Sequence, residues 1–131
     1  MLIGELAQTS GTTTKTLRFY EDVGLLPTPH RSANGYRYYD NPTDTFARID
    51  FIRRGQTAGL TLAQIRQVLE IRDHGTPPCR HVVDLLDERL AGLDQQLADL
   101  HNLRDTVHAL RDRAEGISPD SCDPTAICQY L

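Results

Sequence analysis

The feature that most constrains this chain is a leucine repeat in its second half. The leucines follow one another at alternating steps of four and three residues, as Leu86, Leu90, Leu93, Leu97 and Leu100. This spacing is the seam of a coiled coil, and two successive steps of three at 97–100–103 shift its phase locally. The repeat predicts one helix of about 36 residues, roughly 54 Å long. We expect a dimerisation helix over residues 76–116.

Three cysteines bracket this helix. Cys79 stands where it begins, and Cys122 and Cys128 follow its end in a short tail, residues 117–131. Because the helix holds its two ends far apart, one chain cannot bring Cys79 to Cys122. An antiparallel partner helix would place the tail of one chain beside the start of the other. The pattern therefore predicts a homodimer with two soft-metal sites shared between subunits.

Composition limits the remaining possibilities. A chain of 131 residues that is 39% hydrophobic suits one domain with a modest core and an appendage. It has no apolar run that would span a bilayer and no charged signal-peptide start, so we expect a cytoplasmic protein with no membrane partner. Thiols stay reduced in that compartment, and three cysteines fit metal or redox chemistry better than a disulfide framework.

The charge is distributed unevenly. The net charge is −4, but residues 1–75 carry nine Lys and Arg against eight Asp and Glu, whereas residues 76–131 carry five against ten. The first part is near neutral and the second part is acidic. Any contact with DNA must therefore come from local placement of cations and not from a global field.

The first residues have the spacing of a helix-turn-helix. Ala7 is a small residue where two helices would cross, Gly11 lies in the turn, and Leu17 would anchor the second helix. We expect Thr12 to cap that second helix, over residues 13–23. Its polar face carries hydroxyls and cations that would enter a major groove, unless the helix is a solvated surface helix. These side chains are Thr13, Thr14, Lys15, Thr16 and Arg18.

A β-hairpin follows, in the position of a wing. Asn34-Gly35 predicts a two-residue turn, because both positions accept a positive φ. Aromatic and cationic side chains alternate around it, so that one set packs while the other reaches phosphate. The alternative is that the aromatic residues cover a small core. The set comprises Arg31, Tyr36, Arg37, Tyr38 and Tyr39.

Two further helices complete a head of residues 1–75. Asn41 and Pro42 supply an N-cap and a first-turn proline for a helix to about Gln56. Thr61 and Gln64 form a capping box for the next helix. The fold class is therefore mainly α: a winged helix-turn-helix head with a small hairpin, followed by a long antiparallel coiled-coil dimerisation helix.

These motifs resemble the MerR family of bacterial transcription regulators over about the first 75 residues. The resemblance implies a homodimer that binds promoter double-stranded DNA, controls RNA polymerase and activates by distorting the DNA when an effector binds. By position, Arg18, Tyr20, Arg37 and Tyr38 would hold phosphates, and Thr13, Lys15 and Thr16 would read base edges. The matching runs are 3–7, 16–21, 24–26, 35–39, 52–54 and 59–62.

The cysteine pattern resembles the metal-sensing branch of that family. A cysteine at the first position, here Cys79, is typical there of sensors of doubly charged ions, so the resemblance implies Hg(II), Cd(II), Pb(II) or Zn(II) held by Cys79, Cys122 and Cys128. Tetrahedral zinc would need a fourth ligand. The extra Cys and His ligands of zinc sensors are absent, and only five residues separate Cys122 from Cys128. His81, Asp120 and Asp123 are candidates for the fourth position.

Three alternative functions use the same residues differently. A thiol redox sensor would form a disulfide between Cys122 and Cys128. A regulator of organic ligands would need an aromatic-lined pocket, and the only aromatic residue beyond position 75 is Tyr130. An enzyme would need a nucleophile turn, oxyanion-hole glycines or a carboxylate pair, and the sequence has none of these patterns. We therefore expect a metal-responsive transcription activator and not an enzyme.

Overall fold

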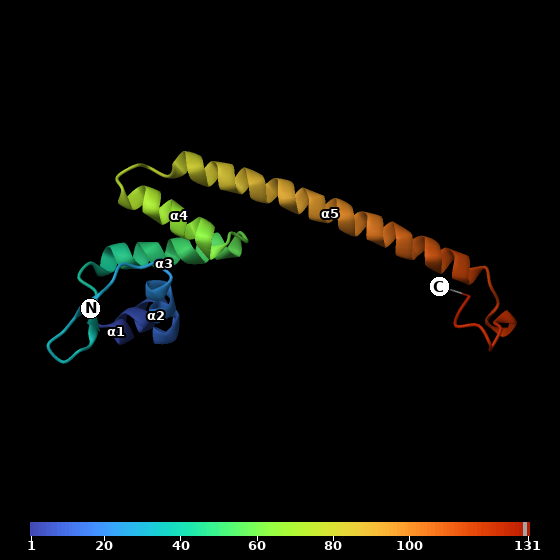
Figure 1. Cartoon of the computed structure of the whole chain (residues 1–131), viewed down its shortest axis with the longest axis horizontal. Helices are drawn as coiled ribbons and strands as arrows, with labels where there is room; N and C mark the ends of the chain where they lie inside the picture. The colour runs from blue at the N-terminus through green and yellow to red at the C-terminus, as the bar shows by residue number, and fades with distance from the viewer. Residues whose placement is uncertain (130) are drawn as a thin grey trace. The chain divides into compact units, whose positions relative to one another are not determined.

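The computed structural model describes residues 1–129 and residue 131; Tyr130, on which one expectation about ligands rested, lies outside the described residues. The chain divides into two compact units, Met1–Arg89 and Leu90–Leu131. It is mainly helical with one two-stranded antiparallel sheet, as predicted (Figure 1). Within the described residues, no helix combines the length and the apolar character needed to cross a membrane.

The helix-turn-helix consists of α1, Ile3–Ser10, and α2, Thr14–Asp22. Gly11 makes the turn with a φ of 69°, and Leu17 is fully buried, as the spacing predicted. The predicted cap was wrong by one residue. Thr13 caps α2, because its hydroxyl accepts the N–H of Thr16 at 3.1 Å. Thr12 instead closes the end of α1, since its own N–H donates to the carbonyl of Ala7.

The hairpin has two very short strands, β1 (His30–Arg31) and β2 (Arg37–Tyr38). The prediction of a two-residue turn was wrong. The N–H of Ser32 donates to the carbonyl of Tyr36, and the N–H of Gly35 donates to the carbonyl of Ser32, so the loop contains three residues. Gly35 alone takes a positive φ, of 81°. A turn followed by a left-handed glycine avoids placing Asn34 in a conformation that is costly for a residue with a side chain.

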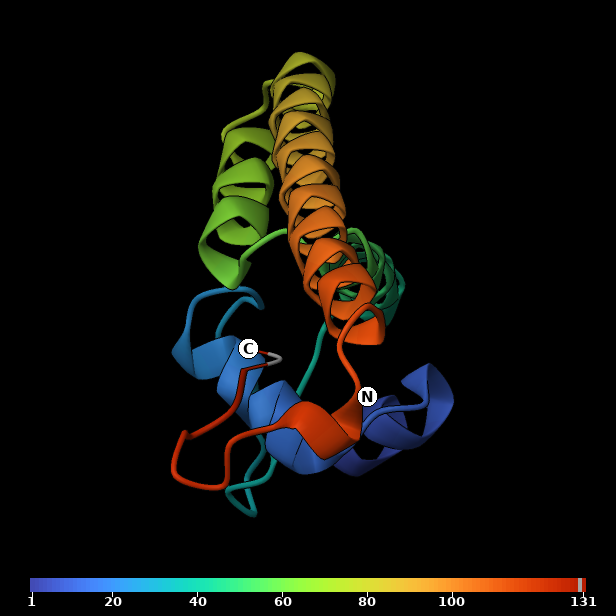
Figure 2. The same ribbon diagram turned by 90° about the vertical axis from the view of Figure 1, so that its right-hand side faces the viewer.

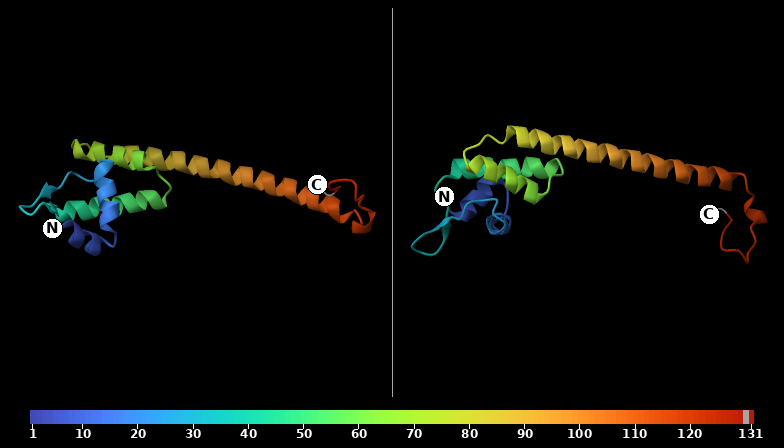
Figure 3. Two further views of the ribbon diagram at one scale, coloured as in Figure 1. Left: turned by 60° about the horizontal axis from the view of Figure 1, so that its bottom comes forward. Right: turned by 45° about the horizontal axis from the view of Figure 1, so that its top comes forward.

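Helices α3, Pro42–Thr57, and α4, Leu62–Asp73, form the second helix pair. Both predicted caps are confirmed: Asn41 accepts the N–H of Asp44, and Thr61 and Gln64 form a reciprocal capping box. Helix α3 contacts both α1 and α4, and the hairpin extends from the same unit (Figure 3).

One hydrophobic core holds the first unit together. It takes side chains from all five helices and from the segments between them. The core residues are Leu6, Ala7, Leu17, Tyr20, Leu25, Leu26, Tyr39, Ile49, Ile52, Leu60, Ile65, Val68, Leu69 and Leu85. Tyr39 is among them, so the expectation that some aromatic residues around the hairpin pack against the core holds for its ring.

Helix α5 runs from Cys79 to Glu115, 37 residues without a break, close to the predicted length. Its beginning belongs to the first unit, where Leu85 is buried and Arg89 Nε donates to the carbonyl of Ala58. In the second unit its seam leucines are exposed. The chain then forms a short helical turn, η1, Pro119–Ser121, and a tail (Figure 2). The exposed seam residues are Leu90, Leu93, Leu97, Leu100 and Leu103.

Candidate DNA-binding face and metal ligands

The outer face of α2 carries the predicted base-reading and phosphate-binding groups. Lys15 and Arg18 are exposed. The hydroxyls of Thr13 and Thr16 lie 2.9 Å apart and hydrogen-bond to each other, besides the capping bond that Thr13 makes. The two cations are therefore exposed on α2, whereas the two threonines also hold the start of the helix.

The predicted cations of the hairpin differ in how they are held. Arg31 is exposed and its Nη1 donates to the carbonyl of Gly35 across the loop. Tyr38 is also exposed. Arg37 is only 25% exposed, and its Nε donates to Glu21 Oε2 at 3.0 Å. The hairpin thus presents one cation held by its own loop and one held by α2.

Tyr20 occupies a different place from the one expected of a phosphate-binding residue. Its side chain packs in the core at 6% exposure, and its hydroxyl donates to Gln56 Oε1 at 3.4 Å. This geometry joins α2 to α3. A contact of Tyr20 with phosphate stays a prediction.

Glu21 was given no role by the sequence reasoning, yet it joins α2 to the hairpin. One carboxylate oxygen accepts from Arg37, and the other accepts from the hydroxyl of Tyr39. Burial raises the pKa of Glu21 above its usual value, and the nearby Arg37 opposes that shift. The available signal was its position four residues after Leu17, which puts it on the side of α2 that faces the head.

The sequence patterns also assigned no role to Arg48. Its Nε and Nη2 donate to the carbonyl of Leu25, at 3.2 and 3.0 Å, and its Nη1 bonds to Asp73. This arginine therefore ties the segment after α2 to α3 and α4. Its spacing from the buried Thr45 and Ile52, three and four residues away, could have placed it on the inner face of α3.

A second ion pair joins the same two helices nearer the surface. Arg72 of α4 donates to the carboxylate of Asp44, close to the start of α3. This hydrogen bond lowers the pKa of Asp44 below its usual value. Burial of the carboxylate acts in the opposite direction and is the smaller effect.

The three cysteines lie where the sequence placed them. Cys79 is the first residue of α5, and its thiol is exposed. Cys122 is half-buried and its Sγ accepts a hydrogen bond from Gln129 Nε2 at 3.2 Å, while Cys128 is exposed. All three are free thiols.

The described residues contain no group of three or more His, Cys, Asp and Glu side chains that could hold an ion. Among the candidates for a fourth ligand, His81 has its Nε2 buried without a hydrogen-bond partner, whereas Cys79 is exposed. Asp123 Oδ1 accepts both the N–H and the hydroxyl of Thr125, which lowers the pKa of Asp123.

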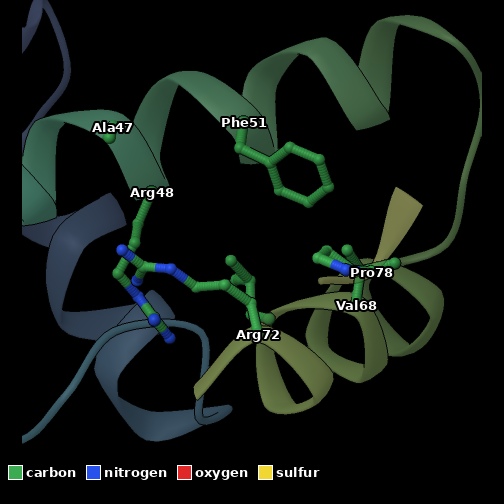
Figure 4. Close-up of a pocket in the computed structure, with 7 residues that line it drawn as sticks. Ala47, Arg48, Phe51, Val68, Arg72 and Pro78 are labelled. Carbon is green, nitrogen blue, oxygen red and sulfur yellow. The ribbon is translucent and has the colours of Figure 1, made fainter. Parts of the chain in front are cut away.

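The first unit also contains a cavity of about 190 Å³, lined by residues of α3 and α4 and by Pro78, the neighbour of Cys79. Figure 4 shows Arg48 and Arg72 on one side of it and Phe51 and Pro78 on the other. Both guanidinium groups are already paired with carboxylates of the first unit. The cavity is therefore mainly apolar where it is open.

Comparison with known proteins decides the family. The model described as "MerR family regulatory protein" matches residues 2–39, and the model "MerR, DNA binding" matches residues 46–110. The solved structure of the transcription regulator PbrR691 from Ralstonia metallidurans, in complex with lead(II), matches all of this chain and 96% of its own, with a TM-score of 0.74 and 35% identity. The chain belongs to the MerR family.

Two curated MerR-related sequences point the same way. A "Mercuric resistance operon regulatory protein" of Bacillus cereus is 42% identical over 82 residues, 63% of this chain, and the match spans 61% of that relative's length. A "Probable heavy metal-dependent transcriptional regulator" of Haemophilus influenzae is 37% identical over 94 residues, 72% of each chain. These MerR relatives are transcription regulators and not enzymes, in agreement with the expectation from the sequence.

Proposed function

We propose that this protein is a homodimeric transcription regulator that binds promoter DNA and senses a soft divalent ion through Cys79 of one subunit and Cys122 and Cys128 of the other. The observation that carries this proposal is the position of three free thiols at the two ends of α5. The names of the relatives, which refer to mercury, heavy metals and lead, support a metal effector.

The exposed leucine seam supports the dimer. Leu90, Leu97 and Leu100 are each more than half exposed in the single chain. A row of leucines in water is unfavourable, and a second α5 would cover it. Antiparallel pairing is the arrangement that also brings Cys79 of one chain to the tail of the other.

Three thiolates suit an ion that can be bound by sulfur ligands without any nitrogen or oxygen ligand. Each thiolate brings one negative charge, which compensates a divalent ion. Among the candidates for a fourth ligand, His81 is partly buried, Asp123 is engaged by Thr125, and Asp120 is exposed. Three sulfur ligands suit Hg(II) and Pb(II), whereas Zn(II) would need one of these side chains as its fourth ligand.

The response requires that the ion bind two dimer states with different affinity, since an ion with equal affinity for both would shift nothing. One state would leave the promoter DNA undistorted, and the other would bend and untwist it so that RNA polymerase can act. The cytoplasm, where thiols stay reduced, is the expected compartment.

Mixed dimers test the shared site. The Cys79→Ser chain and the Cys122→Ser/Cys128→Ser chain should each bind no Pb(II) above background in a chelator competition that records the thiolate-to-metal absorption band. A refolded mixture of the two should recover the band, because half of the mixed dimer's sites regain all three cysteines. A band that survives in the Cys79→Ser chain alone would overturn the shared site. Loss of metal binding with a Cys122–Cys128 disulfide in the wild type would indicate the redox alternative.

A further inference from the structure

Glu21 joins the two DNA-facing elements of the head. It lies near the end of α2, and its carboxylate accepts hydrogen bonds from two residues of the hairpin region, Arg37 and Tyr39. Its side chain is only 9% exposed, whereas the next residue along the helix, Asp22, is exposed. A nearly buried carboxylate that faces the hairpin is unusual on a helix that is otherwise suited to approach a polyanion.

The geometry at Arg37 determines which edge of the guanidinium remains for DNA. The bond to Glu21 uses Nε, and no other hydrogen bond of the described residues uses Nη1 or Nη2 of Arg37. Those two nitrogens form the outer fork of the guanidinium, the edge that binds two phosphate oxygens side by side. Because Glu21 fixes the Nε edge, the plane of the fork is set before DNA arrives.

Tyr39 in turn fixes the carboxylate. Its hydroxyl donates to Glu21 Oε1, while Oε2 receives Arg37, so both oxygens are held. The ring of Tyr39 is buried in the core, and its N–H donates to the carbonyl of Met1. The core therefore holds Tyr39 in place, Tyr39 holds Glu21, and Glu21 holds Arg37.

We propose that Glu21 is a positioning residue for DNA binding: it holds the Arg37 guanidinium so that its outer fork is directed to a backbone phosphate, and it thereby sets the angle of the hairpin against α2. This inference rests on the DNA-binding part of the proposed function and is independent of the metal site. A preset fork loses less side-chain freedom on binding than a mobile one.

Positioning by Glu21 and simple electrostatic repulsion predict opposite changes in DNA affinity for Glu21→Gln. A carboxylate near DNA repels phosphate, so its neutralisation by Glu21→Gln should strengthen binding if Glu21 does nothing else. Positioning predicts the reverse, because the glutamine presents no charge to Arg37 Nε. Asp22→Asn is the matched control: it removes the same charge from the next residue of the same helix, where the side chain is exposed.

The experiment measures the affinity of the full-length apo protein for a mixed-sequence DNA duplex over a series of salt concentrations, because a phosphate contact acts on any sequence. We expect Glu21→Gln to lower affinity about tenfold per bound head and to reduce the salt slope by about 0.9 per head. Asp22→Asn should leave the slope unchanged and affinity equal or higher. Tyr39→Phe, which frees one oxygen of Glu21, should give a smaller loss of the same kind.

A double-variant cycle separates positioning from general damage. Glu21→Gln added to Arg37→Ala should cost nothing further, since the residue to be positioned is gone. Thermal unfolding of each variant establishes that it is folded at the assay temperature. Tighter binding by Glu21→Gln, an unchanged salt slope, or losses that add fully in the double variant would each overturn the proposal. A wild-type protein that binds DNA but does not respond to metal would refute the metal proposal and leave this one standing.

Discussion

Arg48 Nη1 donates to Asp73 Oδ1 at 2.7 Å, and this bond joins α3 to the last residue of α4. The same guanidinium donates twice to the carbonyl of Leu25, in the segment that follows α2. One nearly buried side chain, 7% exposed, thus connects the segment after α2 to the end of α4.

Replacement of Arg48 should destabilise the head strongly. Arg48→Met keeps much of the apolar stem but leaves the Leu25 carbonyl without its donor and removes one of the two arginines that pair with Asp73, at a cost of about 2 kcal/mol in the free energy of unfolding. Urea denaturation followed by circular dichroism measures this. Arg54→Ala on the same helix is the control: its ion pair with Asp50 is exposed, so its loss should cost at most about 0.5 kcal/mol. Equal costs for the two variants would refute the connecting role of Arg48.

The pair of Asp44 and Arg72 should contribute to acid stability. The folded pKa of Asp44 lies below the unfolded value of 3.8, so its contribution is present above that value and is lost as the pH falls through the folded pKa. Asp44→Asn should therefore flatten the fall in unfolding free energy at acid pH. The measurement is a series of urea denaturation curves from neutral pH down to acid pH. An acid slope identical to the wild type would contradict the assignment.

Cys79→Ser should abolish induction by divalent ions, because it removes one of three thiolates from each shared site. DNA binding should stay within a few-fold of the wild type, since Cys79 lies at the start of α5 and outside the DNA-facing surface. A transcription reporter with added Hg(II) or Pb(II), paired with a gel-shift titration, checks both statements. Full induction by the variant would refute the shared-site model.

Arg18→Ala should weaken binding to all DNA sequences. Arg18 is exposed on α2 and is assigned to phosphate, so its loss should lower the salt slope of binding by about 0.9 for each bound head. Lys15→Met provides the contrast, because a base-reading residue should change affinity mainly at particular positions of the operator. Binding to a panel of operator variants distinguishes the two, and an Arg18→Ala loss confined to one base position would make Arg18 a reader.

Leu97→Glu should prevent dimer formation. Leu97 is 65% exposed in the single chain and lies in the middle of the leucine seam, where a carboxylate would stay unpaired between two helices. Sedimentation equilibrium measures the change from dimer to monomer. Gln95→Glu adds the same charge two residues earlier, on the face of α5 opposite the seam, and should leave the dimer intact. A Leu97→Glu chain that stays dimeric would place the interface elsewhere.

Local sequence signals predicted most of the helices well. The caps at Asn41 and Thr61 and the turn at Gly11 depend on residues within three or four positions of each other, and all three are confirmed. The errors at Thr12 and at the hairpin turn have a different origin. At the start of α2, two neighbouring threonines could each act as the cap, and the bond from the Thr12 N–H to the Ala7 carbonyl excludes Thr12. In the hairpin, the bond from the Gly35 N–H to the Ser32 carbonyl selects the three-residue loop.

The sequence by itself determined the long α5 helix and the placement of three cysteines at its ends, because a repeat of leucines and a position along a helix follow from spacing alone. Only the tertiary structure decided the partners of Glu21 and Arg48. Each is joined to residues more than a dozen positions away, and such contacts depend on how α2, α3, α4 and the hairpin pack. The sequence shows that a residue such as Glu21 or Arg48 is charged, but the packing around it selects its ion-pair partner. An unpaired charge is costly only where it is buried, and burial is a property of the tertiary structure.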